Sequence, residues 1–347
     1  VLYSDFVKEE LQRLLARAKA RVDASYEVGY QHERVRYRNW LSSINDDSGA
    51  WLTAGASPKM FEMSNSEFAS AICRRNTVED PTIPKYTELM SREDPSIFRC
   101  ACDGSSRPKL VDPYGYHLVG CRIGANAIRL HDEVVAMVAK LFRSLRLDAI
   151  VEPLRLFNGA DEDASNQRPD IFIRNPRGLG RQVIIDVAVT GVDGQSRSND
   201  EATERPLQAR YDQKMAKYGR VAEQSGLLLV PAVFSHTGQI HGEFKAFVKE
   251  QIKQKLVAFE GDAKASKTRA AMKWWSKCIS MAIAKTASRN VAFKVAKMRE
   301  AIMMDQDEFL MRTSDLTEAG LERANATFLE DVAQNADLYI ANQSGSM

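Results

Sequence analysis

Two aspartates stand inside neighbouring apolar segments of the chain. Asp170 lies in RPDIFIR and Asp186 in VIIDVAV, and the Gly-containing stretch NPRGLG separates the two segments. The segments 169–174 and 182–190 have the composition of two strands joined by a turn. Burying a carboxylate is unfavourable unless another group compensates its charge. We therefore expect a hairpin that brings both carboxylates together near one end of a sheet, where they could take part in chemistry.

That chemistry is suggested by the behaviour of paired carboxylates. Two carboxylates close together repel each other unless a divalent cation lies between them. Mg²⁺ and Mn²⁺ take such oxygen ligands and keep positions for water and phosphate. The bound ion then polarises a phosphodiester and supplies a hydroxide nucleophile. A simpler alternative is structural: Asp170 caps a turn, and Asp186 forms an ion pair with an arginine.

The elements that must position these aspartates alternate between helix and strand. Apolar residues at helical spacing predict a helix at 125–146, with His131 as a hydrogen-bonded residue on its apolar side next to Ile128 and Val135. The remaining elements are predicted as strands at 149–153, 169–174 and 182–190, a helix from Pro206 to about 224, and a strand at 227–235. The order is α-β-β-β-α-β, so the predicted fold class is α+β or α/β, with a mixed sheet flanked by helices.

These residues resemble a known nuclease core. Pro169-Asp170, followed on the next strand by Asp186-Val187-Ala188, resembles the Pro-Asp…(Asp/Glu)-x-Lys motif of type II restriction enzymes, which share the same element order. The resemblance implies that Asp170 and Asp186 are catalytic and hold Mg²⁺ or Mn²⁺. It also implies that Glu133, in RLHDEVV, is an additional metal-binding acid, with Glu152 as an outside candidate.

The motif lysine is missing, because its place is taken by Ala188. A subgroup of the resembled superfamily carries this lysine on the following helix. There, ARYDQKMAKYGRV offers Lys214, with Lys217 and Tyr218 as outside candidates. Lys214 is three residues after Tyr211 and four before Tyr218, so it borders the apolar face of that helix and is predicted to reach the sheet edge. It would stabilise developing charge or position the attacking water.

A cluster of thiols and one imidazole precedes the predicted core. Cys100, Cys102, His117 and Cys121 have the spacing C-x-C-x14-H-x3-C. Three thiolates and one imidazole form a closed, tetrahedral Zn²⁺ site of structural type. The alternative is that Cys100 and Cys121 are small buried residues and that His117 binds nothing. Cys73 and Cys278 are interpreted as ordinary thiols.

The combined pattern over 99–235 is more specific. The Cys/His cluster followed by HDE, EP, RPD, DVAVT and K..KY resembles the restriction-like endonuclease region of site-specific non-LTR retrotransposon proteins. In those proteins the region follows a reverse transcriptase and nicks target DNA to prime copying. The resemblance implies a DNA substrate, a reverse-transcriptase domain and its RNA as partners in a larger polypeptide, and an intracellular location, nuclear in a eukaryote.

No reverse-transcriptase core is recognisable in the chain, because the adjacent acids Asp46-Asp47 lack the preceding aromatic residue of that family. The sequence is therefore interpreted as the C-terminal piece of such a polyprotein or as a domesticated relative. Two alternatives stay open because of Ala188. One is an inactive, zinc-braced DNA-binding module of the same fold, and the other is a structural partner domain of a reverse-transcriptase assembly.

Charge is unevenly distributed along the C-terminal region. Residues 264–299 contain ten Lys or Arg and no acid, whereas residues 300–347 contain ten acids and two Arg, a net charge of −8. Cations free of nearby acids bind phosphate backbones, and tryptophan stacks on unpaired bases. The predicted DNA-binding residues are Arg168, Lys273, Trp274, Lys277, Lys285 and Arg289. The alternative is that Trp275, Ile279 and Ile283 make this helix part of the core.

Composition sets the outer limits. The 347 residues are 44% hydrophobic, carry a formal net charge of +2 and include five cysteines. The odd cysteine count favours a reducing compartment, and no apolar run approaches the roughly eighteen residues of a membrane span. Acids from Asp5 onward argue against a signal peptide. The predicted division is 1–98 as a helical region, 99–124 as a zinc-knuckle-like segment, 125–262 as the nuclease core and 263–347 as a helical C-terminal region. Within the first region, helices are predicted at 3–23 and 65–75, the second with Asn65 as its N-cap and Glu67 in its first turn.

Overall fold

The computed structural model describes residues 27–54, 61–83, 99–100, 102, 109–121, 125–153, 156–157, 168–191 and 204–303. The helix predicted at 3–23 and the acidic segment from 304 onward lie outside these residues. Within them the fold is mixed α/β, with seven α-helices and a four-stranded mixed sheet. A separate two-stranded ribbon, β1 (Arg99–Cys100) with β2 (Lys109–Leu110), is antiparallel. None of the described helices is both long enough and apolar enough to cross a membrane.

The four-stranded sheet has the order β3-β4-β5-β6. Its strands are β3 (Ala149–Val151), β4 (Ile171–Ile173), β5 (Val183–Thr190) and β6 (Leu228–Ser235). Strand β4 pairs antiparallel with both β3 and β5, and β6 pairs parallel with β5. Ile171 pairs with Ile185, so the register places Asp170, one residue before β4, opposite Asp186.

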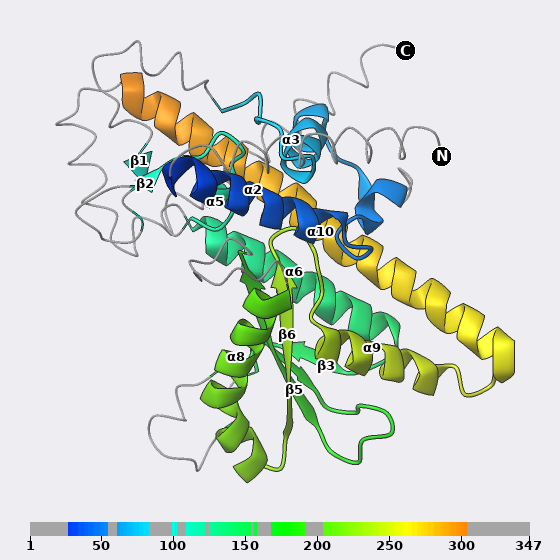
Figure 1. The fold of residues 1–347 in the computed structure, drawn as a ribbon. Coiled ribbons are helices and arrows are strands. Elements are labelled where there is room, and N and C mark those ends of the chain that lie inside the picture. Colours follow the sequence, from blue (N-terminus) through cyan, green and yellow to red (C-terminus); the bar gives the residue numbers. More distant parts are fainter. Residues whose placement is uncertain are drawn as a thin grey trace, which may run out of the picture.

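Three helices cover the sheet, as Figure 1 shows: α8 (Glu204–Gln224) on one face, and α6 (Asn126–Ser144) with α9 (Gly242–Lys255) on the other. The predicted α-β-β-β-α-β order is therefore present as α6-β3-β4-β5-α8-β6. Side chains of β5 alternate between the two faces. Ile185 and Val187 belong to the large core on the α6 side, whereas Ile184 and Ala188 pack on the α8 side.

The predicted apolar face of α6 was partly wrong. Leu130, Val134 and Val138 are at most 2% exposed, but Ile128 is 61% exposed. The true buried face is thus rotated relative to the predicted one near the start of the helix. The packing of α6 against the sheet and α10 decides which residues turn inward, and the helix begins after Ala125, which has a positive φ of 58°.

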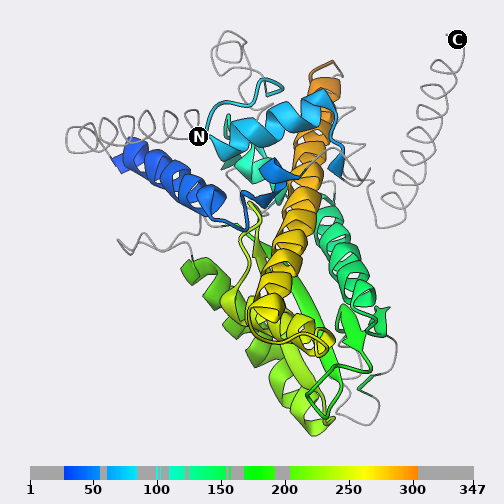
Figure 2. The ribbon, with the colours of Figure 1, turned by 90° about the vertical axis from the view of Figure 1, so that its right-hand side faces the viewer.

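The long helix α10 (Gly261–Met303) joins the sheet layer to the N-terminal elements. It contacts α6 and α9, and also η1 (Ala50–Thr53), α3 (Asn65–Arg75) and α5 (Tyr116–Val119). Figure 2 shows it running beside α6, with α3 near its far end. Trp275, Ile279 and Ile283 are buried in the same core as the sheet. The core interpretation of this basic segment is confirmed for these residues, and the helix runs across the region predicted as separate from 263 onward.

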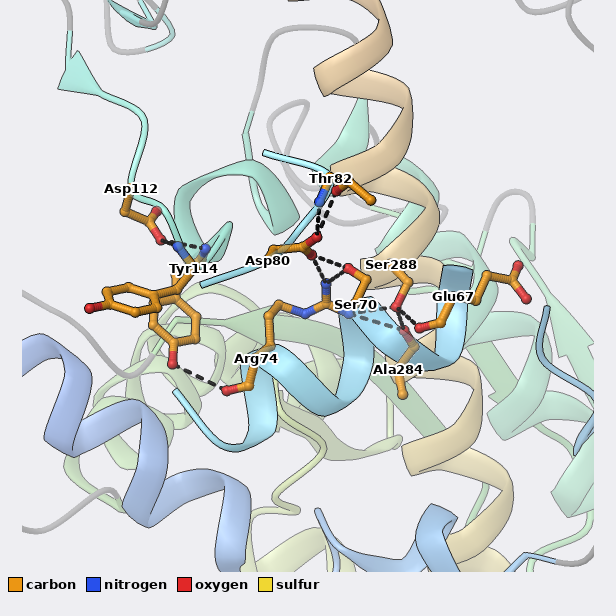
Figure 3. A network of polar contacts seen from close by, with 10 residues as sticks. Glu67, Ser70, Arg74, Asp80, Thr82, Asp112, Tyr114, Ala284 and Ser288 are labelled. Atoms are coloured by element: carbon orange, nitrogen blue, oxygen red, sulfur yellow. Dashed lines mark hydrogen bonds and ion pairs between the residues drawn. The ribbon is translucent and has the colours of Figure 1, made fainter. Parts of the chain in front are cut away.

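A buried arginine fastens α3 to α10, as Figure 3 shows. The Arg74 guanidinium donates hydrogen bonds to Ser70 Oγ and Ser288 Oγ at 2.6 Å each, and lies 3.8 Å from a carboxylate oxygen of Asp80. Burial lowers the pKa of Arg74 to about 10, although Asp80 opposes that fall. The side chain stays charged at neutral pH, so its buried partners are required for the packing of α3.

The helix α3 begins one residue earlier than predicted. Asn65 was predicted as its N-cap, but the cap is Ser64, whose hydroxyl accepts a hydrogen bond from the Glu67 N–H. The Glu67 carboxylate in turn accepts from the Ser64 N–H, at 2.7 Å. This capping box satisfies two backbone donors at once, and Ser64 competes with Asn65 because both residue types cap helices well. The predicted acid of the first turn, Glu67, is confirmed.

Candidate functional site

The Asp170 carboxylate lies at the junction of β4, β5 and α6. Its Oδ2 accepts a hydrogen bond from the Val187 N–H at 2.5 Å, and the same oxygen is 3.3 Å from His131 Nε2. The side chain is 17% exposed. The bond to Val187, the residue after Asp186, holds Asp170 next to the second aspartate, as the predicted hairpin register requires.

Asp186 is the more deeply buried of the two acids, with its side chain 3% exposed. Its Oδ2 forms an ion pair with Lys214 Nζ of α8. Apart from that ion pair, this buried oxygen receives no hydrogen bond from the described residues. Burial raises the pKa of Asp186, the Lys214 ammonium opposes the rise, and the charge of Asp170 adds to it. The Lys214 ammonium therefore compensates the charge of the ionised carboxylate, which lies beside a second acid, Asp170.

The structure distinguishes the two candidate lysines. Lys214 is only 14% exposed and reaches Asp186 directly. Lys217 instead donates a hydrogen bond to the Tyr218 hydroxyl at 2.8 Å and lies over its ring, 4.6 Å from the centroid. The Tyr218 ring is also 5.8 Å from Lys214 Nζ. The aromatic ring thus borders both ammonium groups, and Lys214 is the one at the carboxylates.

The packing around Ala188 explains why the lysine beside Asp186 comes from α8 and not from β5. Ala188 shares a face of β5 with Asp186, as predicted, and is 3% exposed. It packs against Leu207 and Val233, with Tyr211 at the margin. A lysine on the strand would displace these side chains. Lys214 lies on α8, about one turn after Tyr211 and two turns after Leu207. It reaches Asp186 from the helix that covers this face of the sheet.

His131 is the site residue whose role the sequence did not predict. It was expected to be a hydrogen-bonded core residue, but it is 33% exposed and its partner is Asp170. The interaction with Asp170 raises the pKa of His131 to about 9, burial acts in the opposite direction, and Asp132 adds to the rise. In the sequence, the feature that pointed to His131 was its place in the HDE segment, two residues before Glu133.

Glu133 does not lie with the aspartates. It lines a cavity of about 230 Å³ between α6 and α10, together with Lys140, Lys285 and Arg289. Successive residues of a helix are about 100° apart around its axis, so His131 and Glu133, two residues apart, lie on nearly opposite faces. Since His131 faces Asp170, Glu133 must face away, and we do not retain it as a metal ligand.

Glu152 is close to the site through its backbone. Its N–H donates to the Asp170 carbonyl oxygen at 2.8 Å, in a left-handed conformation with φ of 46°. Its side chain is 67% exposed and forms an ion pair with Arg168 at 2.8 Å. A non-glycine residue in this conformation is strained and persists only where the surroundings enforce it. Glu152 therefore braces the backbone of Asp170, and its carboxylate is directed to Arg168.

The two aspartates fit a hard divalent cation by the chemistry of their oxygens. They are not joined by a third ligand: within the described ranges, the only group of three or more potential ligand side chains within 4.8 Å of one another is Cys102, His117 and Cys121. Mg²⁺ is commonly held by one or two carboxylates, with water and substrate phosphate completing its coordination. Apart from its ion pair with Lys214, the buried Oδ2 of Asp186 has no hydrogen-bond partner among the described residues, which is consistent with such an arrangement.

The second candidate metal centre is this Cys/His group. Cys102 Sγ is 3.5 Å from His117 Nε2, close to the roughly 3.6 Å expected between sulfur and nitrogen ligands of a tetrahedral Zn²⁺. The Asp112 carboxylate accepts hydrogen bonds from the His117 and Tyr116 N–H groups, at 2.8 and 3.0 Å, and so orders the start of α5. The predicted fourth ligand, Cys100, is in β1, and its side chain lies outside the described residues.

The group is tied to the rest of the fold by two asparagines. Asn126 Nδ2 donates to the Leu118 carbonyl at 2.8 Å, and Asn290 Nδ2 of α10 donates to the Val119 carbonyl at 3.2 Å. Both acceptors precede the buried Cys121. The Cys/His group is thus fixed between α6 and α10, as expected of a brace.

The predicted DNA-binding residues have varied surroundings. Lys273 and Trp274 are exposed, although Trp274 also contacts Phe61 edge to face, with ring centroids 5.2 Å apart. Lys277 donates to the Thr53 carbonyl at 2.8 Å, and Arg289 forms an ion pair with Glu67. These last two cations therefore hold the N-terminal elements against α10.

No family model matches the chain, and a search of curated proteins finds none that is significantly similar. The chemical assignment therefore depends on the geometry of Asp170, Asp186 and Lys214. Two acids from adjacent strands and one ammonium from the following helix meet near one end of a sheet. Such a set can bind a divalent cation and place a positive charge beside a phosphate.

Proposed function

We propose that this chain is a metal-dependent endonuclease that hydrolyses DNA phosphodiester bonds. The observation that carries the proposal is the contact of Lys214 with Asp186, on the strand face where Ala188 replaces the motif lysine. The α6-β3-β4-β5-α8-β6 order supports a restriction-endonuclease-like core. The sequence resemblance over residues 99–235 extends the proposal to target-site nicking by a retroelement-type protein, with a reverse-transcriptase domain and its RNA as partners.

Each site residue has a distinct part in the proposed reaction. Asp170 and Asp186 would hold Mg²⁺ or Mn²⁺, and the bound ion polarises the phosphodiester and lowers the pKa of water. Lys214 is mostly buried beside Asp186, so its charge is weakly screened and offsets the negative charge that develops on the phosphate. The Tyr218 ring borders this ammonium, 5.8 Å from Lys214 Nζ.

The Cys/His group has a structural part in the proposal. Cys102, His117 and Cys121, with Cys100 as the fourth ligand, would bind Zn²⁺. A closed site of this composition has no open position for catalysis. Its attachment through Asn126 and Asn290 supports a brace between the N-terminal helices and the nuclease core.

Cleavage of supercoiled plasmid by the full chain at low salt tests the proposal. The reactions contain Mg²⁺, Mn²⁺ or excess EDTA, and compare the wild type with Asp170→Asn and Asp186→Asn. Asp148→Asn is the matched control, because Asp148 is an exposed acid that pairs with Arg174 near β3. We expect metal-dependent relaxation by the wild type and the control, and loss of at least about a hundredfold in rate for the two site variants.

The competing function is a DNA-binding module without catalysis. It is favoured by the fact that Lys214 already neutralises Asp186 within the chain. In that case folded protein binds DNA with a steep salt dependence, the plasmid stays intact under every metal condition, and the aspartate variants bind as the wild type does. That set of results would reject the endonuclease proposal.

A further inference from the structure

We infer that His131 is a positioning residue that fixes the Asp170 carboxylate so that Oδ1 is presented to the catalytic metal. The inference rests on the proposed function, because it assigns a role around the same site.

The geometry of Asp170 carries the inference. Both polar contacts described for its carboxylate fall on the same oxygen: the Val187 N–H donates to Oδ2 at 2.5 Å, and His131 Nε2 is 3.3 Å from Oδ2. One donor comes from β5 and the other from α6. Two donors from different elements restrict rotation of the carboxylate, and neither contact occupies Oδ1.

The surroundings of His131 favour this role over a packing role. Its neighbours Leu130 and Val134 are 2% and 0% exposed, whereas the His131 side chain is 33% exposed. The ring is held from its other side, because Nδ1 is 3.0 Å from Asp132 Oδ1. Loss of a residue that hydrogen-bonds to a metal ligand typically weakens metal affinity by about ten- to a hundredfold.

The test is Mn²⁺ binding by the zinc-loaded full chain, measured by titration calorimetry. The signal of an Asp170→Asn/Asp186→Asn double variant is subtracted, to remove binding elsewhere. His131→Ala removes the donor, and His131→Gln restores an N–H donor at a similar reach. Ile128→Ala and Ile128→Gln are the matched controls, because Ile128 is exposed one turn earlier on α6.

We expect His131→Ala to weaken Mn²⁺ binding about tenfold or more, and His131→Gln to recover most of this loss. Both Ile128 variants should bind as the wild type does. In plasmid cleavage, His131→Ala should need correspondingly more Mn²⁺ for half-maximal rate, while the rate at saturating Mn²⁺ recovers. Thermal unfolding of each variant shows whether the fold is retained.

The outcomes separate this inference from the proposed function. If the wild type binds Mn²⁺ and cleaves DNA, but His131→Ala binds Mn²⁺ equally well, the inference is wrong and the endonuclease stands. Equal weakening in His131→Ala and His131→Gln also contradicts it, since a donor would then not matter. If the wild type binds Mn²⁺ through the aspartates without cutting DNA, the endonuclease fails and the positioning role can still be measured. A wild type that binds no Mn²⁺ rejects both.

Discussion

At the scale of single residues, the site is a set of compensations for buried charge. Asp186 is nearly inaccessible, and its charge is balanced by one ammonium from another element. A buried ion pair adds little net stability, but removal of one partner leaves an uncompensated charge. Lys214 therefore has two roles under the proposed function, since it stabilises the folded acid and stands beside the reacting phosphate.

The first prediction separates the two lysines. Lys214→Met should lower the rate of plasmid cleavage by about a hundredfold or more, because it removes the ammonium at Asp186. Lys217→Met should lower it by less than about tenfold, because Lys217 contacts Tyr218 rather than an aspartate. Single-turnover cleavage at saturating Mg²⁺ measures both rates. A larger effect of Lys217→Met would transfer the role to that residue.

The residues of the site were predictable to different degrees. Asp170 and Asp186 follow from the two-residue period of strands, which fixes faces without further knowledge. Lys214 follows from the apolar face of its helix. His131 and Glu133 were not assigned correctly, because the phase of α6 relative to the sheet is set by tertiary packing. A rotation that leaves Ile128 exposed is enough to bring His131 to Asp170 and turn Glu133 to α10.

At the scale of elements, the ends of helices hold the N-terminal part against α10. The capping box of α3 includes Glu67, which also accepts a hydrogen bond from Arg289 Nε at 2.5 Å. Burial raises the pKa of Glu67. The hydrogen bonds from Ser64 and Arg289, together with the charges of Arg289 and Lys285, outweigh burial and leave the pKa below its ordinary 4.5.

The second prediction concerns the stability that Glu67 provides. A carboxylate with a lowered folded-state pKa stabilises the fold above its unfolded pKa, and this contribution is lost as the pH falls through the folded pKa. Glu67→Gln should therefore reduce the free energy of unfolding at neutral pH by about 1 kcal/mol. The difference should shrink as the pH falls through the lowered folded-state pKa of Glu67. Urea unfolding over this pH range measures it, with Glu62→Gln as an exposed control.

The third prediction concerns the Cys/His group. The purified chain should contain about one Zn²⁺, and Cys102→Ser and His117→Asn should each lose it. If the wild type is held at free Zn²⁺ about a thousandfold above its Kd, the variants should be less stable by about 4 kcal/mol. Elemental analysis and thermal unfolding give the two readouts. Cys73→Ser, at a free thiol away from the group, should keep both the metal and the stability.

The presence of helices and strands was more predictable than the residues at which they end and the elements against which they pack. The strands 182–190 and 227–235 correspond to β5 and β6 within a residue at each end, because short runs of buried apolar residues, β-branched in β5, identify them. The cap of α3 moved by one residue, since Ser64 and Asn65 are both good caps. For the basic helix, charge suggested a DNA-binding surface and apolar spacing suggested a core helix, and the buried side of α10 follows the spacing.

At the scale of the whole molecule, α10 makes one core out of regions that the sequence suggested were separate. Trp275 contacts Phe142 of α6 edge to face, with ring centroids 4.9 Å apart. Val291 is buried in the same core cluster as Trp51 and Val111. The predicted division at 262 therefore does not correspond to a break in packing.

The fourth prediction is that a fragment of residues 125–262 does not fold cooperatively. Without α10, the side chains of α6 that pack against it, such as Phe142, would face solvent. The fragment should bind a hydrophobic dye and lack near-UV circular dichroism, as expanded states do. The chain from 27 to 303 should unfold in a single transition. A sharp transition in the short fragment would show that residues 125–262 form an independent unit.

The position of α10 in the chain also has a consequence for synthesis. Translation proceeds from the N-terminus, so Trp51, Val111 and Val134 are all made before Trp275 and Val291, which share their core. Their apolar surfaces must stay uncovered on the ribosome until α10 has been released. Release of α10 from the ribosome is thus required before this core can close, and until then the apolar surfaces of the earlier elements stay exposed.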